Sequence, residues 1–171
     1  MLSYVVLVFV FFALIAMSAY LIERLAVSKN NNHRYQQITT IYTSLRLDNS
    51  YRPVKTNVFG DKRAYNYDKG RTESSSVEYG RNATSEETLK DITSRARAAG
   101  FSEAGSAYEG SIAPQYYFKN DAGNYLRVTI EPKAAHDAAV YGTEPSVLTP
   151  EERAQAPVYV TVKVNLDDNN E

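Results

Sequence analysis

Histidine and cysteine, which commonly serve as catalytic bases and nucleophiles, are scarce in this sequence. The chain of 171 residues has no Cys and two His, His33 and His136. His136 precedes Asp137, and such a pair forms half of a catalytic triad, but no Gly-x-Ser-x-Gly motif supplies the nucleophile. We therefore interpret His136 as an exposed loop histidine and the serines at 74–76 as the polar face of an edge strand. These residues predict no catalytic site, and we expect no enzymatic activity.

Motifs that bind metals, cofactors or nucleic acids are also absent from the sequence. Without Cys there is no disulfide scaffold or thiolate zinc site, and the chain contains no Walker loop, Gly-x-Gly-x-x-Gly or His-Glu-x-x-His motif. The acidic tail at 167–171 has calcium-ligand residue types without the spacing of a calcium loop. The 19 Lys and Arg residues are balanced by 20 Asp and Glu residues, which gives no positive field for nucleic acid. We expect no cofactor, no metal ion and no nucleic-acid partner.

Tyrosine is the residue type in excess, with 14 in the chain. Many of them fall on or next to predicted strands, where half-buried sheet packing accounts for tyrosine without a functional role. Tyrosine is also favoured in binding surfaces, because it gives contact area at a small entropic cost. The sharper hypothesis is a solvent-side patch of Tyr and basic residues that binds a partner protein or an envelope glycan. Its members would be Tyr125, Arg127, Tyr159 and Lys163.

The clearest local pattern predicts a helix over residues 85–99. Thr84 to Glu87 form a capping box, and Gly100 stands where a left-handed helix cap is needed. The segment Asn82-Ala83-Thr84 also matches a glycosylation sequon, but the capping role accounts better for Thr84.

The remaining patterns predict one further amphipathic helix and several strands. The helix has Ile38, Ile41, Tyr42 and Leu45 on one face and ends before Pro53. A hairpin is expected from 62–68 and 71–79, with its turn at 68–70, and a second from 115–119 and 124–131. Residues 132–157 are expected to form a surface excursion with a helical turn at 149–152, and 158–166 the last strand. The sequence thus predicts an α+β fold: a small antiparallel sheet with one helix packed on a face.

The first segment of the chain differs in composition from the rest. No charged residue precedes Glu23, and Leu2 to Ile22 form an apolar run of about 21 residues that would rise about 31 Å as a helix. This length predicts a transmembrane helix in a lipid bilayer. A cleaved signal peptide is the alternative, because Ala16-Met17-Ser18 offers small residues, although the run is longer than usual and has no basic start.

The orientation of this predicted anchor has two readings. Arg24, Lys29 and Arg34 follow the apolar run and no cation precedes it, so a positive-inside count places the domain in the cytoplasm. The absence of Cys, the Tyr-rich sheet composition and the polar loops favour the outside. We expect a cell-membrane protein with its domain outside the cytoplasm. The expected organisation is an anchor at 1–27, a juxtamembrane linker at 28–33, a soluble domain at 34–166 and an acidic tail at 167–171.

Several segments together resemble a known group of sequences. These are Gly60 to Arg63, Arg71 to Thr84, the Ala-Ala-Gly-Phe cap at 98–101 and the ending VKVNLDDNNE. The chain resembles uncharacterised single-pass membrane proteins of Saccharibacteria-type bacteria. The resemblance implies an anchored bacterial envelope domain and carries no activity; the life of such cells on a host surface implies an adhesion or envelope role.

Three classes of function follow from these patterns. The first is a non-enzymatic, single-pass anchored domain that contacts an envelope or host-surface protein. The second is a pilin-like structural subunit, although the chain lacks the short basic leader and the Glu near the fifth position of the apolar run. The third is a membrane-tethered enzyme, which would require His136 in a cleft with a perturbed pKa.

Overall fold

The computed structural model describes residues 2–59, 74–109, 111, 113–141 and 156–167, without the side chains at 2–13, 23, 24, 26–28, 30, 31, 58, 59 and 138–141. Its described strands form one antiparallel sheet in the order β1-β2-β6-β5-β4-β3. This confirms the predicted α+β class. The elements are α1 (Leu2–Ser44), β1 (Arg52–Phe59), β2 (Ser74–Arg81), α2 (Ser85–Ala98), β3 (Phe101–Ala107), β4 (Gln115–Asn120), β5 (Tyr125–Pro132), α3 (Lys133–Tyr141) and β6 (Val158–Asn165).

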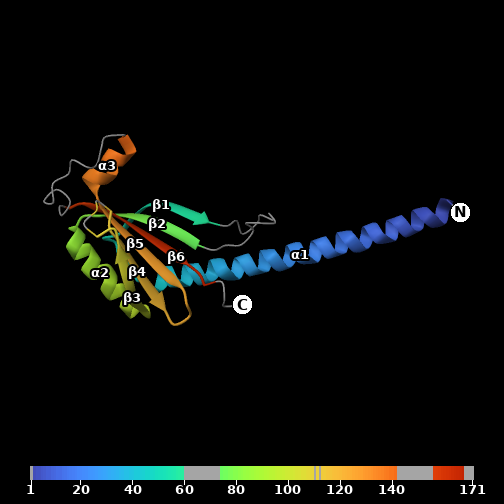
Figure 1. The fold of residues 1–171 in the computed structure, drawn as a ribbon, viewed down its shortest axis with the longest axis horizontal. Helices are drawn as coiled ribbons and strands as arrows, with labels where there is room; N and C mark the ends of the chain where they lie inside the picture. Colours follow the sequence, from blue (N-terminus) through green and yellow to red (C-terminus); the bar gives the residue numbers. More distant parts are fainter. Residues whose placement is uncertain (1, 60–73, 110, 112, 142–155, 168–171) are drawn as a thin grey trace.

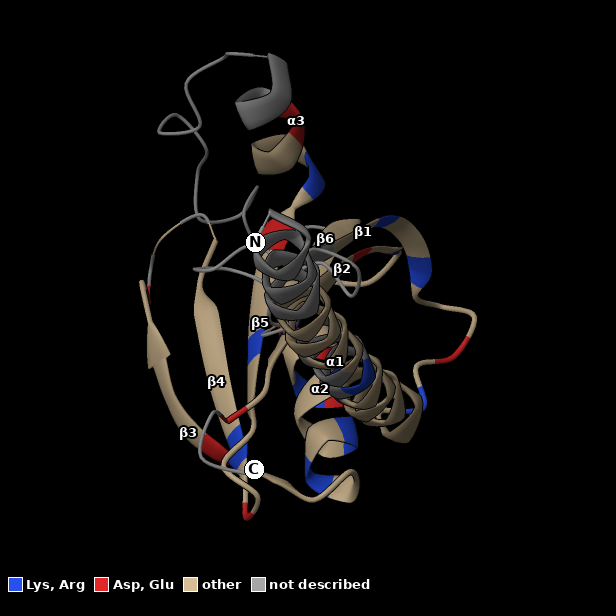
Figure 2. Ribbon diagram, turned by 90° about the vertical axis from the view of Figure 1, so that its right-hand side faces the viewer, with Lys and Arg blue, Asp and Glu red and all other residues tan. Residues whose placement is uncertain are grey.

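The sheet has one face covered by α1 and α2, which we call the inner face (Figures 1 and 2). The strand β6 lies in the middle of the sheet, between β2 and β5, and its valines alternate inward as the sequence predicts. Burial of this alternating aliphatic stripe is what fixes the register, because a slip by one residue would turn the whole stripe to solvent. The largest fully buried side chains of the core are Phe118, Ile38, Leu45, Ile92, Leu126, Ile130, Val128, Val158, Val160, Val162 and Val164.

The helix α1 is continuous over 43 residues, and its two ends have different surroundings. Its last turns pack Ile38, Ile41 and Leu45 into the core, while its N-terminal part projects away from the sheet (Figure 1). The residues at 28–33, expected as a linker, are helical instead. Their asparagines are only weakly unfavourable in a helix, and no Gly or Pro is present there to end it.

A tyrosine hydroxyl also fastens α1 to the sheet. The hydroxyl of Tyr42 lies 2.8 Å from the carbonyl oxygen of Ser75 on β2 and 2.8 Å from that of Val162 on β6. Burial raises the pKa of Tyr42 above its ordinary value.

Among the described residues, no helix combines the length and the apolar character needed to cross a membrane. The anchor at residues 2–22 therefore stays a prediction from the sequence.

The helix α2 agrees with the sequence prediction at both of its ends. The backbone N–H of Glu87 donates to Oγ1 of Thr84 (3.2 Å), and the backbone N–H of Thr84 donates to Oε2 of Glu87 (3.0 Å). Gly100 follows the helix with φ +84°, in the left-handed region that disfavours other residues. The sequon residue Thr84 is thus committed to the helix cap.

Two strands of the sheet were not predicted from the sequence. The first strand, β1, begins at Arg52 and contains Pro53, which an edge strand tolerates; the strand predicted at 62–68 and its turn at 68–70 lie outside the described residues. Phe101–Ala107, for which the sequence pattern predicts no strand, forms the edge strand β3. Only Phe101 of β3 is buried, so this strand lacks the alternation of apolar residues by which strands are recognised.

The segment after β5 also differs from the prediction. It was expected to form an irregular excursion, but α3 follows β5 directly and contacts β5 and β6. Ala135 is fully buried, which fastens this helix to the sheet. The helical turn predicted at 149–152 lies outside the described residues. The sheet thus carries α1 and α2 on its inner face and α3 at one end of the other face, which we call the outer face. The sequence predicted only one helix packed on the sheet.

Candidate functional site

The four residues predicted to form an interaction surface all lie on the outer face of the sheet. The register of β5 and β6 places Arg127 directly opposite Lys163. Tyr125 lies opposite Asn165 at one end of these strands, and Tyr159 lies opposite Glu131 toward the other. Tyr159 and Asn165 are six residues apart on β6, about 20 Å along an extended strand. The structure therefore brings the two cations together and separates the two tyrosines.

A third side chain extends the pair of cations into a row. Tyr117 on β4 is opposite Arg127, and all three side chains are partly exposed. We call Tyr117, Arg127 and Lys163 the central row of the outer face. Like charges directly opposite each other repel, so this row places two cations where an acid or a neutral residue would favour strand pairing. The sequence pattern did not single out Tyr117, although the register set by the hairpin at 120–123 could have.

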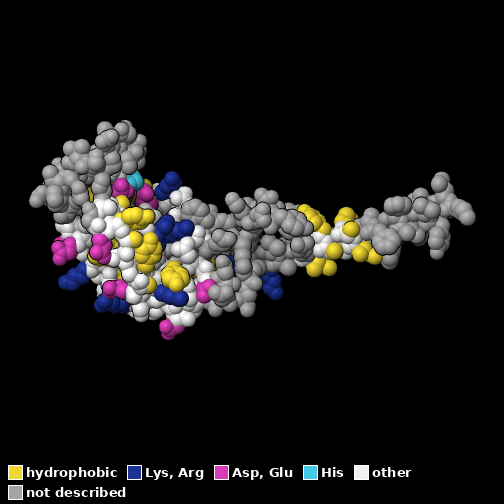
Figure 3. Space-filling view, in the orientation of Figure 1, with side chains coloured by type: hydrophobic (Ala, Val, Ile, Leu, Met, Phe, Trp, Pro, Cys, Tyr) yellow, Lys and Arg dark blue, Asp and Glu magenta, His cyan; other side chains and the backbone are white. Residues whose placement is uncertain are grey.

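Tyr125, outside the central row, is in contact with another basic residue. Nζ of Lys119 lies 4.9 Å from the centre of the Tyr125 ring, and the hydrogen bond to Tyr125 raises the pKa of Lys119. Tyr125 is 40% exposed, which makes it one of the exposed large aromatic side chains of the sheet. Figure 3 shows the outer face, where hydrophobic side chains, a class that includes Tyr, lie among Lys and Arg side chains. Of the residue types on this face, the tyrosines and Arg127 are those enriched in protein-binding surfaces.

Tyr159 lies instead under α3. The ring of His136 stacks on the ring of Tyr159, with their centroids 4.1 Å apart. Nδ1 of His136 lies 3.2 Å from Oε2 of Glu131, and Nε2 lies 4.0 Å from Oε1 of Glu78. The expectation of an exposed loop histidine was wrong, because the side chain of His136 is only 23% exposed and belongs to a helix docked on the sheet. The sequence did not reveal this contact, since its partners come from three separate strands.

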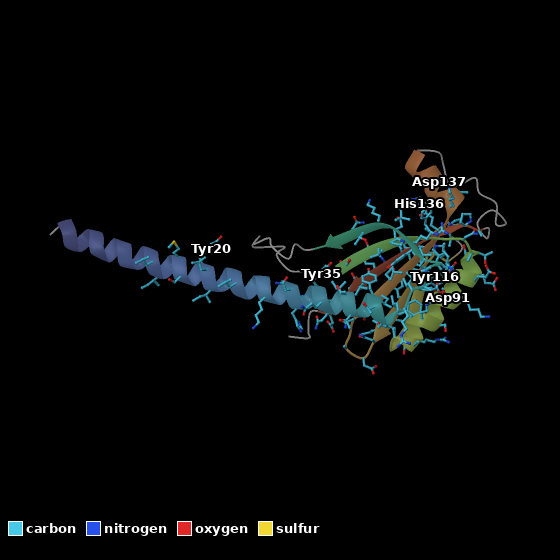
Figure 4. All side chains as sticks on the ribbon, turned by 180° about the vertical axis from the view of Figure 1, so that it is seen from behind. Tyr20, Tyr35, Asp91, Tyr116, His136 and Asp137 are labelled. Atoms are coloured by element: carbon cyan, nitrogen blue, oxygen red, sulfur yellow. The ribbon has the colours of Figure 1, made fainter. Side chains whose placement is uncertain are left out.

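The suspected half-triad His136–Asp137 does not have triad geometry. Asp137 forms an ion pair with Lys133 one turn earlier in α3, while the contacts of His136 are made to two glutamates. Figure 4 shows His136 and Asp137 together on α3, at a distance from Asp91 and Tyr116. Among the described residues, no group of three His, Cys, Asp or Glu side chains is placed to hold a metal ion.

The most connected charged cluster in the described residues surrounds Asp91 on α2. Oδ2 of Asp91 accepts hydrogen bonds from the hydroxyl of Tyr51 (2.8 Å), from Arg81 (2.8 Å) and from Nε of Arg95 (3.0 Å). Burial acts to raise the pKa of Asp91, but these hydrogen bonds and charges outweigh it and hold the pKa below its usual value. Both guanidinium groups also lie over the ring of Tyr51. Because each member is bound by the others, we interpret this cluster as a structural connection between the corner after α1, the end of β2 and α2.

Two grooves open on the surface of the described residues. One, of about 600 Å³, lies between α2 and the strands β3 and β4, and its lining includes Leu89, Tyr116 and Phe118. Burial raises the pKa of Tyr116 there. The other, of about 490 Å³, lies where β1 begins and β2 ends, and its lining includes Arg52, Arg81, Lys133 and Tyr159. Neither was predicted from the sequence, because each is lined by residues far apart along the chain.

Comparison with known proteins adds no relative. No family model, no curated protein and no solved structure matches this chain. The resemblance to membrane proteins of Saccharibacteria-type bacteria therefore stays a prediction, and the outer face and the grooves are interpreted from their own chemistry.

Proposed function

We propose that the chain is a single-pass membrane-anchored, non-enzymatic interaction protein whose α+β domain lies outside the cytoplasm. In this proposal the outer face of the sheet binds another protein of the envelope or of a host surface. The observation that carries the proposal is the central row, in which Arg127 and Lys163 face each other across β5 and β6. A sheet that served stability alone would gain by placing an acid or a neutral residue at one of these positions.

The chemistry of this row points to the kind of partner it would bind. Two adjacent cations beside the ring of Tyr117 favour an acidic partner surface, because carboxylates placed between them would relieve their repulsion. Arginine and tyrosine are also the residue types enriched among the energetically dominant residues of interfaces. Complementary charge would mainly raise the rate of association and exclude wrong partners.

The anchoring part of the proposal is supported by the sequence of residues 2–22 and by the continuity of α1. A single helix would join the bilayer to the sheet without a flexible linker. From Ile22 to Arg34, which is buried against the domain, the helix rises about 18 Å at about 1.5 Å per residue. The domain would therefore stand clear of the lipid headgroups, with the sheet held at a fixed distance from them.

The proposal of a non-enzymatic role is supported by how the titratable groups are engaged. His136 is held between Glu78 and Glu131 against Tyr159, and Asp137 is paired with Lys133. These contacts fasten α3 to the sheet, which accounts for the histidine without a reaction.

A pilin-like subunit is a second candidate, favoured by one observation. The helix α1 projects from the domain at its apolar end and packs on an antiparallel sheet at its other end (Figure 1). Packing of such projecting helices against one another would build a filament. Negative-stain electron microscopy of the purified full-length chain after detergent removal tests this candidate: regular filaments support it, and dispersed particles count against it.

The proposed interaction surface is tested by cross-linking in the native cells. A photo-cross-linking amino acid replaces Thr129 on the outer face, and a control replaces Ser94 on α2. The proposal expects a discrete adduct from position 129 that is absent from position 94 and is lost when Arg127→Glu is added. An adduct of equal yield with Arg127→Glu, or adducts of equal yield from both positions, would contradict the proposed surface.

A further inference from the structure

The groove of about 490 Å³ at the end of the sheet has an unusual charge composition. Three cations line it, and they come from different elements: Arg52 from β1, Arg81 from β2 and Lys133 from α3. Neutral donors from Asn49, Ser50 and Asn82 line it as well, and no Asp or Glu belongs to its described lining. In a chain whose acids and bases are nearly balanced, this concentrates positive charge in one hollow.

Gly80 keeps the floor of this groove open. It lies between Arg52 on β1 and Tyr159 on β6 in one row of the sheet. A Cβ at Gly80 would lie 3.8 Å from Cγ2 of Val54 and 3.9 Å from Cε1 of Tyr159, which is ordinary van der Waals contact. A larger side chain at this position would therefore occupy the groove without a backbone clash, and the absence of one leaves room for a ligand.

The cations of the groove differ in how far they are already neutralised. Arg81 is paired with Asp91, and Lys133 with Asp137. Arg52 is exposed, and no ion pair is formed between it and another described residue. The first turn of α3, which begins at Lys133, contains no acidic residue, so the positive end of its helix dipole is uncompensated by its own side chains. Glu131 and Glu78 contact His136 in this same turn, but neither belongs to the described lining of the groove. Among the three lining cations, Arg52 is therefore the group best able to pair with a ligand.

We propose that this groove binds an oxyanion, either a phosphate or a carboxylate group of a larger molecule. Arg52 forms the charged contact, the amide groups of Asn49 and Asn82 supply neutral hydrogen bonds, and the ring of Tyr159 forms an apolar wall. Arginine suits this role, because its planar fork of donors matches the two oxygens of a carboxylate or phosphate.

The position of the groove restricts where the ligand comes from. The groove lies at the end of the sheet away from the N-terminus of α1 (Figure 1). If residues 2–22 are the anchor, which rests on the proposed function, the groove faces away from the protein's own bilayer. Its ligand is then carried by another molecule and not by the headgroups around the anchor. The binding of the oxyanion itself does not depend on the anchor or on the outer-face partner.

Titration of the full-length chain in micelles of an uncharged detergent tests the proposal. Sodium phosphate and sodium acetate are added separately, each compared with sodium chloride at equal ionic strength, and the backbone amide signals of Gly80 and Asn82 are followed by NMR. The variants are Arg52→Gln, which removes the cation, and Gly80→Val, which fills the floor. Lys55→Gln is the matched control, since Lys55 is an exposed cation on the same strand outside the groove lining.

The expected result is a saturable shift with phosphate, with acetate or with both, beyond the effect of chloride. Arg52→Gln should weaken this binding about tenfold or more, the loss of one charged hydrogen-bond partner. Gly80→Val should also weaken it, while Lys55→Gln should leave it within about twofold of the parent chain. Saturation by one anion alone identifies the class of oxyanion. Shifts that do not saturate, equal binding by Arg52→Gln, or an equal loss with Lys55→Gln would overturn the proposal.

Discussion

The hydroxyl of Tyr51 donates a 2.8 Å hydrogen bond to Oδ2 of Asp91, 40 residues further along the chain. This bond joins the corner after α1 to the middle of α2, and Arg81 adds the end of β2 to the same carboxylate. Burial raises the pKa of Tyr51 above its ordinary value, so the tyrosine remains a donor throughout the physiological range. The cluster fixes α1 and α2 relative to each other on the inner face.

Replacing Asp91 by Asn should lower the stability of the domain. The substitution keeps the shape but removes the charge that Arg81 and Arg95 share, and an amide oxygen is a weaker acceptor for their hydrogen bonds than a carboxylate oxygen. We expect a loss of about 1–3 kcal/mol in the free energy of unfolding, measured by urea denaturation. The control is Lys90→Gln, which removes an exposed charge from the middle of the same helix and should change stability by less than about 0.5 kcal/mol. Equal stability of Asp91→Asn and the parent chain would refute the structural role of the cluster.

The free energy of unfolding should also fall in acid, because three carboxylates have lowered pKa values in the folded chain. Hydrogen bonds from Ser50 lower the pKa of Asp48 to about 2, and hydrogen bonds from Thr84 lower the pKa of Glu87. The pKa of Asp91 is lowered as well. A carboxylate whose pKa is lower in the folded than in the unfolded chain contributes stability above its unfolded pKa, near about 4, and loses it as the pH falls through its folded pKa.

The acid effect is measured as the urea midpoint at several pH values between 6 and about 2. The midpoint should be level above about pH 5 and should fall most steeply between about pH 4 and 2. Asp48→Asn should make this fall shallower, since one of the contributing groups is gone. A midpoint that rises on acidification in this range would contradict the assigned directions of the three pKa shifts.

The packing of α1 on the sheet should be weakened measurably by the loss of one buried side chain. Ile38 is 2% exposed and contributes to the core from a helix that continues far beyond it. Ile38→Ala should cost about 2–5 kcal/mol in the free energy of unfolding, because it leaves a cavity between α1 and the sheet. Thr39→Ala, on the exposed side of the same turn, should remain within about 0.5 kcal/mol of the parent chain. If both variants unfold at the same urea concentration, the end of α1 is not part of the core.

The central row should show a conflict between stability and binding. Arg127→Gln removes one of two facing cations and should stabilise the domain by about 0.2–1 kcal/mol. The same variant should lose the cross-link formed from position 129 in cells. Lys90→Gln, which removes an exposed cation from α2, should leave the cross-link unchanged. A variant at Arg127 that is destabilised and retains the cross-link would show that this row serves the fold and not a partner.

The parts of the fold that the sequence predicted are those governed by local patterns. The capping box at Thr84, the left-handed Gly100 and the alternating valines of β6 each depend on neighbours within a few residues, and the structure confirms all three. The strand β3 was not predicted, because an edge strand buries few of its side chains. Only Phe101 is buried, and mostly small or polar residues follow it.

The candidate site was less accessible to sequence reasoning, because it depends on which strands are neighbours. The alternation in β5 and β6 placed Tyr125, Arg127, Tyr159 and Lys163 on one side, but it did not show that Arg127 and Lys163 face each other. That relationship requires β5 and β6 to pair in a specific register across the segment between them. The docking of His136 on Tyr159 and the groove beside Arg52 likewise arise from contacts between distant segments, for which one sequence contains no local signal.

The proposal of a membrane-anchored domain outside the cytoplasm is tested most directly by protease accessibility in intact cells. The full-length chain carries a C-terminal epitope tag, and a cytoplasmic protein serves as the control for cell integrity. The account predicts that external protease removes the tag from a membrane-bound protein while the cytoplasmic control stays intact. Protection of the tag until the cells are lysed would contradict it, and would place the domain on the side that Arg24, Lys29 and Arg34 indicate by their charge.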